Sequence, residues 1–200
     1  MKRKEYSSGA VAHSFWFMEF RNEVKLLAEG KSFEDIKVLC KSENIFAAST
    51  PKRAAQIFDI VSARIKAMGN NFYPIFENRD VSAQKIFNLA AIMVNDTLFF
   101  DFVYEVIREK IIIGSNEYKP GDLNIFFKDK QLQSEKVAGW TDATFARLSR
   151  IYKAFLFEAG MTDRGRNVRK IFQPILEPDM KKWFVDNDME QIVKALLGER

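Results

Sequence analysis

The chain has 200 residues, of which 47% are hydrophobic and 29% are charged, and this balance is typical of a folded globular protein and excludes an intrinsically disordered chain. The single cysteine, Cys40, excludes an intramolecular disulfide and is typical of a reducing compartment, so we expect a cytoplasmic protein. The net charge of +4 resides in residues 141–170, where seven basic residues accompany three acidic ones while the rest of the chain sums to zero. This segment predicts a directed electropositive surface and a polyanionic partner.

Helix caps and helix breakers along the chain predict an all-α, compact multi-helix globular protein. The predicted helices cover residues 10–29, 33–41, 51–68, 81–95, 97–113, 123–133 and 142–159, and two short helices follow residue 178. A weak alternation of apolar and polar residues over 166–175 allows one small β-hairpin. We expect two helical lobes, 1–114 and 115–200, because Pro120 and Gly121 lie in a segment that is typical of a boundary.

The most apolar window, residues 86–107, is interrupted by Asp96, Asp101 and Glu105. Because a carboxylate at the centre of a bilayer costs several kcal/mol, this window predicts a buried helix pair and no membrane span. The charged residues 1–5 are not followed by a clean apolar run, so we expect no secretion signal.

Residues 123–157 have the layout of a helix-turn-helix, with a helix, a short turn and a second helix that begins after Thr141. On the second helix the apolar residues recur at the helical period, and the basic residues fall on the other side, beside the small residue Ala143. Such a helix can enter the major groove of DNA, and the basic loop 161–170 can then follow the adjacent phosphates. An ordinary amphipathic helix with a solvated basic face is an equally weighted alternative. The candidate DNA-binding residues here are Thr141, Ala143, Arg147, Arg150, Lys153, Arg164, Arg166, Arg169 and Lys170.

Residues 33–68 have the same layout, with helices over 33–41 and from 51 onward. The candidate DNA-binding residues are Lys52, Gln56 and Lys66, on the side of the second helix opposite its apolar face, and Arg53 at the edge of that face. Helices pack in this way in many proteins that do not bind DNA, and for this segment judged by itself that interpretation is favoured. The presence of two such units in one chain supports DNA binding by both.

Catalytic residues are scarce in this sequence. His13 is the only histidine and is expected in an aromatic helix, and Cys40 has no partner for a zinc site. Residues 160–167 approximate a phosphate-binding loop, but Arg166 and Asn167 replace the required lysine and serine or threonine, and the segment follows a helix instead of a strand. We therefore expect no enzyme, no metal site and no cofactor.

Several stretches resemble the BrxA family, a small core component of BREX bacteriophage-exclusion systems. They are YSSGA, SFWFMEFR and EGKS at residues 6–10, 14–21 and 29–32, and NIF at 44–46, followed by Ser49, Arg53 and Ala63-Arg64; Trp140-Thr141, Thr144, Arg147-Leu148 and Ala159-Gly160 continue the pattern. The resemblance implies an all-helical protein with two helix-turn-helix units that binds double-stranded DNA. It also implies partners among the BREX proteins, namely a DNA methyltransferase, an alkaline-phosphatase-like protein and large ATPase components.

Three functional hypotheses follow from these observations. The leading one is a non-enzymatic component of phage defence that binds double-stranded DNA, as a monomer when alone. The second is a protein–protein adaptor, in which the aromatic first helix or the acidic end of the chain (171–200, net charge −2) docks to other members of the complex. The third is an RNA-binding factor similar to the antitermination factor NusB; Tyr152 and Phe172 could then stack on bases, although core positions are favoured for both.

Overall fold

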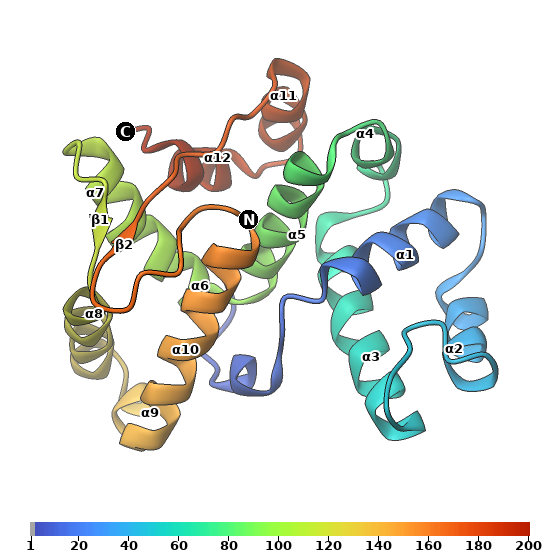
Figure 1. Cartoon of the computed structure of the whole chain (residues 1–200), viewed down its shortest axis with the longest axis horizontal. Helices are drawn as coiled ribbons and strands as arrows, with labels where there is room; N and C mark the ends of the chain where they lie inside the picture. Colours follow the sequence, from blue (N-terminus) through green and yellow to red (C-terminus); the bar gives the residue numbers. More distant parts are fainter. Residues whose placement is uncertain (1–2) are drawn as a thin grey trace. The chain divides into compact units, whose positions relative to one another are not determined.

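The computed structural model describes residues 3–200 and divides into two compact units (Figure 1). The small unit is Trp16–Ala91, and the described part of the large unit is made of residues 3–15 and Ile92–Arg200. Both units are built mainly from helices, so the predicted all-α class is confirmed. Residues 115–122, where the sequence predicts a lobe boundary, lie inside the large unit.

The helices of the small unit are α1 (Phe17–Ala28), α2 (Phe33–Ser42), α3 (Pro51–Met68), α4 (Tyr73–Glu77) and most of α5 (Val81–Asn95). Helices α2 and α3 begin at the caps that the sequence predicts. Ser32 and Asp35 form the expected capping box of α2, and the Thr50 hydroxyl accepts a hydrogen bond from the backbone N–H of Arg53 at 3.2 Å. The short helix α4 was not predicted, because its five residues contain no cap and are held by packing of Phe76.

The predicted helix over 10–29 is wrong in its first third. Residues Gly9–Ala12 form a 3-10 helix, and α1 begins only at Phe17 because Trp16 adopts a left-handed conformation with φ of 48°. The Trp16 ring lies 5.0 Å from the Arg53 guanidinium and 5.6 Å from that of Arg64. These tertiary contacts stabilise a backbone conformation that is rare for a bulky residue.

Phenylalanine rings fill the core of the small unit. Phe20, Phe72, Phe76 and Phe87 are fully buried or nearly so, and their ring centres lie 5.7 to 6.2 Å apart in stacked and edge-on pairs. Offset and edge-on arrangements are the favoured geometries of aromatic pairs. The high phenylalanine content of the sequence therefore serves packing.

The large unit contains the remaining elements. They are α6 (Thr97–Phe102), a π-helical turn (Val103–Ile107), α7 (Arg108–Ile112), β1 (Glu117–Tyr118), α8 (Pro120–Gln133), α9 (Glu135–Ala138), α10 (Asp142–Glu158), β2 (Arg169–Lys170), α11 (Pro178–Asp186) and α12 (Glu190–Leu197). The helix predicted over 97–113 is thus continuous but contains a wider π turn in its middle. The short α9 lies where the sequence predicts only a turn.

A two-stranded antiparallel sheet joins the basic segment to the start of α8. Lys170 is paired with Glu117, and Arg169 with Tyr118. Thus the alternation in 166–175 marks a strand, but the partner of that strand comes from residues 117–118 instead of from the same stretch (Figure 1). A local pattern predicts a strand but not its distant partner.

The apolar window of the sequence is a buried helix pair, as predicted. Phe87, Leu89, Phe99 and Phe102 in this window are fully buried. Within the part of the chain that the structure describes, no single helix has the length and apolar character to cross a membrane. One bent helix pair, Val81–Asn95 with Thr97–Ile112, is long and apolar enough to do so by length and composition alone.

Candidate nucleic-acid interface

Helix α10 presents the first group of basic side chains. The Thr141 hydroxyl accepts a hydrogen bond from the backbone N–H of Thr144 at 3.3 Å, as an N-cap does. The predicted apolar face is buried, and Phe99 packs against Tyr152 and Phe155 with ring centres 4.9 and 5.3 Å apart. This packing fixes the orientation of the helix. The opposite side exposes Thr141, Ala143, Arg147 and Arg150, whereas Lys153 is partly buried.

The loop that follows α10 is closed by Asp163. Its Oδ1 atom accepts hydrogen bonds from the backbone N–H groups of Gly165 at 3.0 Å and Lys170 at 3.1 Å. The backbone N–H of Asp163 donates to the Lys170 carbonyl at 3.2 Å, and Thr162 and Ile171 form an antiparallel bridge. The backbone hydrogen bond from Gly165 is the main cause that lowers the pKa of Asp163. The basic loop is therefore an ordered structure with a charged carboxylate at its base.

Three cations from the helix and the loop lie close together. Arg169 Nη1 donates a hydrogen bond to the Lys153 carbonyl at 3.0 Å. Burial lowers the pKa of Lys153, and the positive charges of Arg169 and Arg150 lower it further. The structure thus brings together α10 and the loop as the sequence predicts. An anion at this position relieves the repulsion among these three side chains.

The cations of α10 and its loop form no close ion pairs with the carboxylates of residues 3–200. Within residues 3–200, none of the seven forms a side-chain ion pair within 4.0 Å. Arg164 instead lies over the Phe157 ring at 4.5 Å, and Arg164, Arg166 and Lys170 are all exposed. We define the basic surface as these seven residues: Arg147, Arg150, Lys153, Arg164, Arg166, Arg169 and Lys170.

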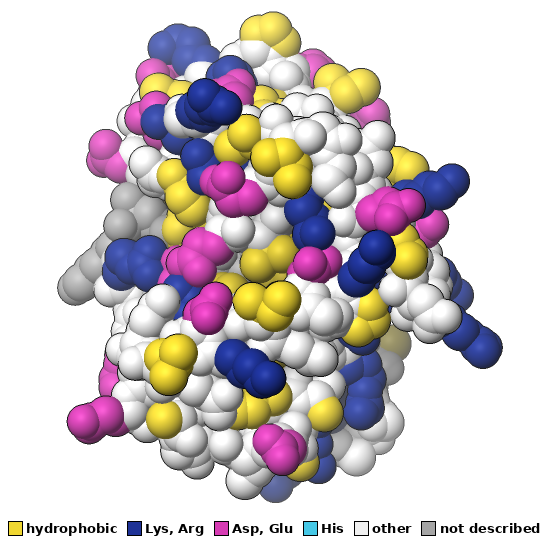
Figure 2. All heavy atoms as spheres, turned by 90° about the vertical axis from the view of Figure 1, so that its left-hand side faces the viewer, with side chains coloured by type: hydrophobic (Ala, Val, Ile, Leu, Met, Phe, Trp, Pro, Cys, Tyr) yellow, Lys and Arg dark blue, Asp and Glu magenta, His cyan; other side chains and the backbone are white. Residues whose placement is uncertain are grey.

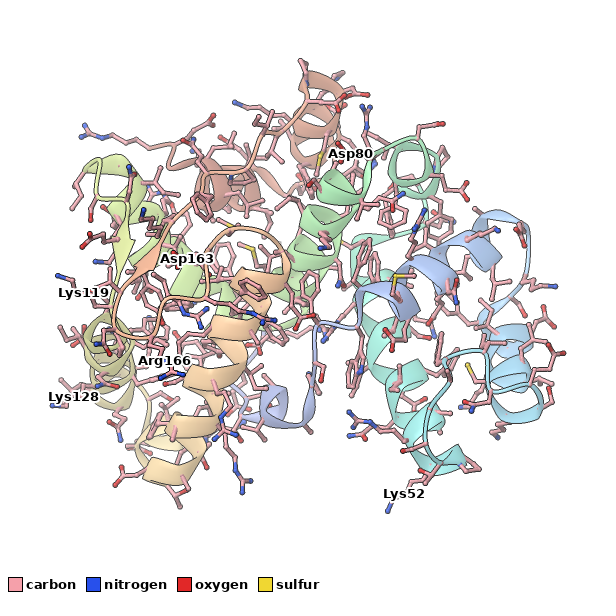
Figure 3. The ribbon with its side chains drawn as sticks, in the orientation of Figure 1. Lys52, Asp80, Lys119, Lys128, Asp163 and Arg166 are labelled. Carbon is pink, nitrogen blue, oxygen red and sulfur yellow. The ribbon has the colours of Figure 1, made fainter. Side chains whose placement is uncertain are left out.

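The candidate residues of α3 do not form a comparable surface. Lys52 is exposed (Figure 3), but the Arg53 guanidinium contacts the Trp16 ring and donates to Gln56 Oε1 at 2.7 Å. The ammonium of Lys66 lies 4.3 Å from the centre of the Phe33 ring. Two of the four candidates are therefore bound to each other, and a third covers an aromatic ring.

Both predicted helix-turn-helix units have longer connections than the turn of that motif. Residues 43–50 join α2 to α3, and residues 134–141, which contain α9, join α8 to α10. Asn44 organises the first connection: its amide donates to the Ala48 carbonyl and accepts from the Ala48 N–H, both at 2.9 Å. Helix α8 supports α10 through Phe127, whose ring centre lies 5.2 Å from that of Phe145. The assignment of these segments as helix-turn-helix units stays a prediction.

The sequence patterns do not single out two further exposed lysines at α8. Lys119 precedes α8 and Lys128 lies on it; both are exposed and point outward in Figure 3. The pairing of β1 with β2 brings the start of α8 next to Lys170, and no local signal in the sequence indicates that pairing. The face over α7 and α8 in Figure 2 mixes basic, acidic and hydrophobic side chains, so it is neither a positively nor a negatively charged patch.

Other reactive groups lack catalytic surroundings. His13 lies in the segment between the 3-10 helix and α1, not in a helix as the sequence predicts. Burial raises the pKa of the Cys40 thiol to about 11, with a further contribution from Glu23, so this cysteine is a weak nucleophile. Among residues 3–200 no three His, Cys, Asp or Glu side chains are grouped closely enough to hold a metal ion.

Comparisons with known proteins identify the family to which this chain belongs. A solved structure, the crystal structure of an uncharacterized protein from Magnetospirillum magneticum, matches with a TM-score of 0.80 at 17% identity, over 98% of this chain and 100% of that one. A curated relative from Bacillus cereus (strain H3081.97), the BREX protein BrxA, is 36% identical over 180 residues, which is 90% of each protein. The BrxA family model matches residues 4–188. The chain therefore belongs to the BrxA family.

Proposed function

We propose that this BREX component binds double-stranded DNA without enzymatic activity. The observation that carries the proposal is the basic surface, whose seven cations have no ion-pair partner among residues 3–200. Exposed cations without carboxylate partners are available for phosphate contacts, which supply most of the affinity of DNA-binding proteins. The named relative is a BREX protein, and a DNA-binding subunit is a role compatible with such a system.

The geometry of α10 suggests how the duplex is bound. Arg147 and Arg150 are three residues apart and share one exposed face of the helix. Ala143 precedes them near the N-terminus of the helix, where a small side chain allows close approach to the groove. The loop with Arg164, Arg166 and Lys170 then contacts the neighbouring backbone. The α3 set contributes less, because Arg53 and Gln56 are engaged with each other.

A charge-reversal variant tests this proposal. Arg147→Glu/Arg150→Glu replaces two exposed cations and leaves the buried face of α10 intact. We expect its affinity for a labelled duplex to fall at least about tenfold, because each lost phosphate contact removes a counterion-release contribution. The melting temperature is expected to stay near that of the wild type.

The control is Lys31→Glu/Lys41→Glu, which makes the same change of net charge at two exposed positions of the small unit. This variant is expected to bind the duplex like the wild type. If both double variants lose the same affinity, overall charge governs binding, and α10 is not the contact surface.

A protein–protein adaptor is a second candidate function. A groove of about 270 Å³ lies between α7 and α8, and Ile113 and Ile125 on its rim are 74% and 62% exposed. Exposed isoleucines beside a groove are typical of a protein contact.

We propose that the partners are the other BREX proteins (methyltransferase, phosphatase-like protein and ATPase) and that the protein acts in the cytoplasm. Ile113→Asp/Ile125→Asp should release a partner in co-purification; unchanged recovery of every partner would remove this groove as a docking site.

A further inference from the structure

The segment after the basic loop places an apolar side chain among exposed cations. Residues 168–172 alternate in exposure: Val168 is 37% and Phe172 49% exposed and Lys170 is also exposed, whereas Ile171 is only 6% exposed. In extended backbone, residues two apart lie on the same face. Val168, Lys170 and Phe172 therefore form one outward ridge. We call these three residues the ridge.

The backbone under the ridge is held by tertiary hydrogen bonds. The N–H of Phe172 donates to the Met161 carbonyl at 2.9 Å, and the N–H of Ile171 donates to the Asn116 carbonyl at 2.8 Å. Lys170 is fixed by its pairing with Glu117 and by its hydrogen bond to Asp163. The exposed Phe172 ring is thus presented from an anchored backbone.

Packing in the core does not explain why a phenylalanine occupies position 172. A phenylalanine in this position forgoes part of the stabilisation that a core position would give. The sequence favours a core position for both Tyr152 and Phe172. Tyr152 is fully buried as expected, but Phe172 is not. Lys170, two residues before Phe172, is exposed, and so is Arg166 in the preceding loop (Arg166 is labelled in Figure 3).

We propose that Phe172 is an apolar wedge that inserts between stacked base pairs of bound duplex DNA, with the cations of the ridge and loop contacting the flanking phosphates. This inference rests on the proposed function and specifies its mode. Phenylalanine and other apolar side chains act in this way in proteins that kink the duplex, and the cost of unstacking is offset by additional backbone contacts. The exposed ammonium of Lys170 on the same ridge favours nucleic acid over an apolar protein partner.

Bulged DNA provides the test, because unpaired nucleotides at a bulge already weaken stacking and reduce the cost of insertion. Binding of wild-type protein is measured on a perfect duplex of about 30 base pairs and on the same duplex with a central bulge. We expect the bulged duplex to bind roughly tenfold more tightly, since the bulge removes part of the stacking that insertion must otherwise disrupt. Phe172→Ala should bind both duplexes alike, and Phe172→Leu should retain the preference.

Leu132→Ala is the matched control, because it removes an exposed apolar side chain from α8 in the same unit; it should keep the full preference. If Phe172→Ala keeps the preference, or if the wild type binds both duplexes equally, the wedge is wrong while DNA binding stands. Should the wild type bind neither duplex, the proposed function fails, and the wedge fails with it.

Discussion

At the scale of single residues, arginines of the same charge serve different purposes in this chain. Arg53 contacts the Trp16 ring and donates a hydrogen bond to Gln56, whereas Arg147 is exposed and has no ion-pair partner within residues 3–200. Both are candidates in the sequence, because a helical pattern gives the face on which a side chain lies but not the distant ring that it contacts. The candidate interface therefore lies mainly on α10 and not on α3.

Glu23 offers a residue-scale prediction about stability. Its side chain is fully buried and accepts a hydrogen bond from the Ser62 hydroxyl, and burial raises its pKa from 4.5 to about 8. Between these two pKa values the folded state holds a proton that the unfolded state releases. The free energy of unfolding therefore falls as pH rises, by at most about 1.4 kcal/mol per pH unit. The stabilising contribution is complete below pH 4.5 and is lost as pH rises through about 8.

Glu23→Gln removes this titration and keeps an acceptor for Ser62. We expect the variant to lose less stability than the wild type between about pH 5 and pH 8, and to be the more stable protein at the upper end. Urea unfolding at both pH values measures the difference. Parallel pH dependence in the two proteins would show that Glu23 does not titrate in the folded state over this range.

At the scale of elements, the sequence predicts what local chemistry determines. The caps at Ser32, Thr50 and Thr141 are confirmed, and so is the buried face of α10. The left-handed break at Trp16 was missed because it depends on contacts with residues of α3. The pairing of residues 117–118 with 169–170 was missed for the same reason, since about fifty residues of sequence separate the partners.

The closed loop after α10 leads to an element-scale prediction. A Cβ atom at Gly165 would lie 1.7 Å from the Val168 carbonyl oxygen, so Gly165→Ala must displace the loop backbone. We expect a loss of about 1–3 kcal/mol in the free energy of unfolding and weaker binding of duplex DNA, because Arg164 and Arg166 are carried by this loop. Calorimetry and a duplex titration measure the two effects.

Gly121→Ala is the control for that experiment, because a Cβ at Gly121 meets no atom within 4 Å. It is expected to leave both stability and duplex affinity unchanged or slightly improved, as alanine is a better helix former than glycine. Equal affinity for DNA in the Gly165→Ala and Gly121→Ala variants would indicate that the loop does not contact the duplex.

At the scale of the whole molecule, the net positive charge is concentrated in one segment, whereas aromatic packing extends through both units. The aromatic residues fill two cores, while the net positive charge is concentrated in α10 and the loop that follows it. The fold class and this concentration of charge follow from composition and periodicity. The outward position of Phe172 and the addition of Lys119 and Lys128 do not, because they depend on how residues 117–118 pair with the basic segment. The candidate site is therefore predictable in its main helix and not in its periphery.

The central claim is that the basic surface binds duplex DNA through its phosphates. The most direct measurement is the affinity of the purified protein for duplex, matched single strand and an RNA hairpin as salt is raised from roughly 50 to roughly 200 mM. We predict a preference for the duplex and, with about six phosphate contacts, an affinity that falls roughly a thousandfold over this range. Absence of duplex binding at the lowest salt, or tighter binding of the RNA hairpin, would contradict the claim.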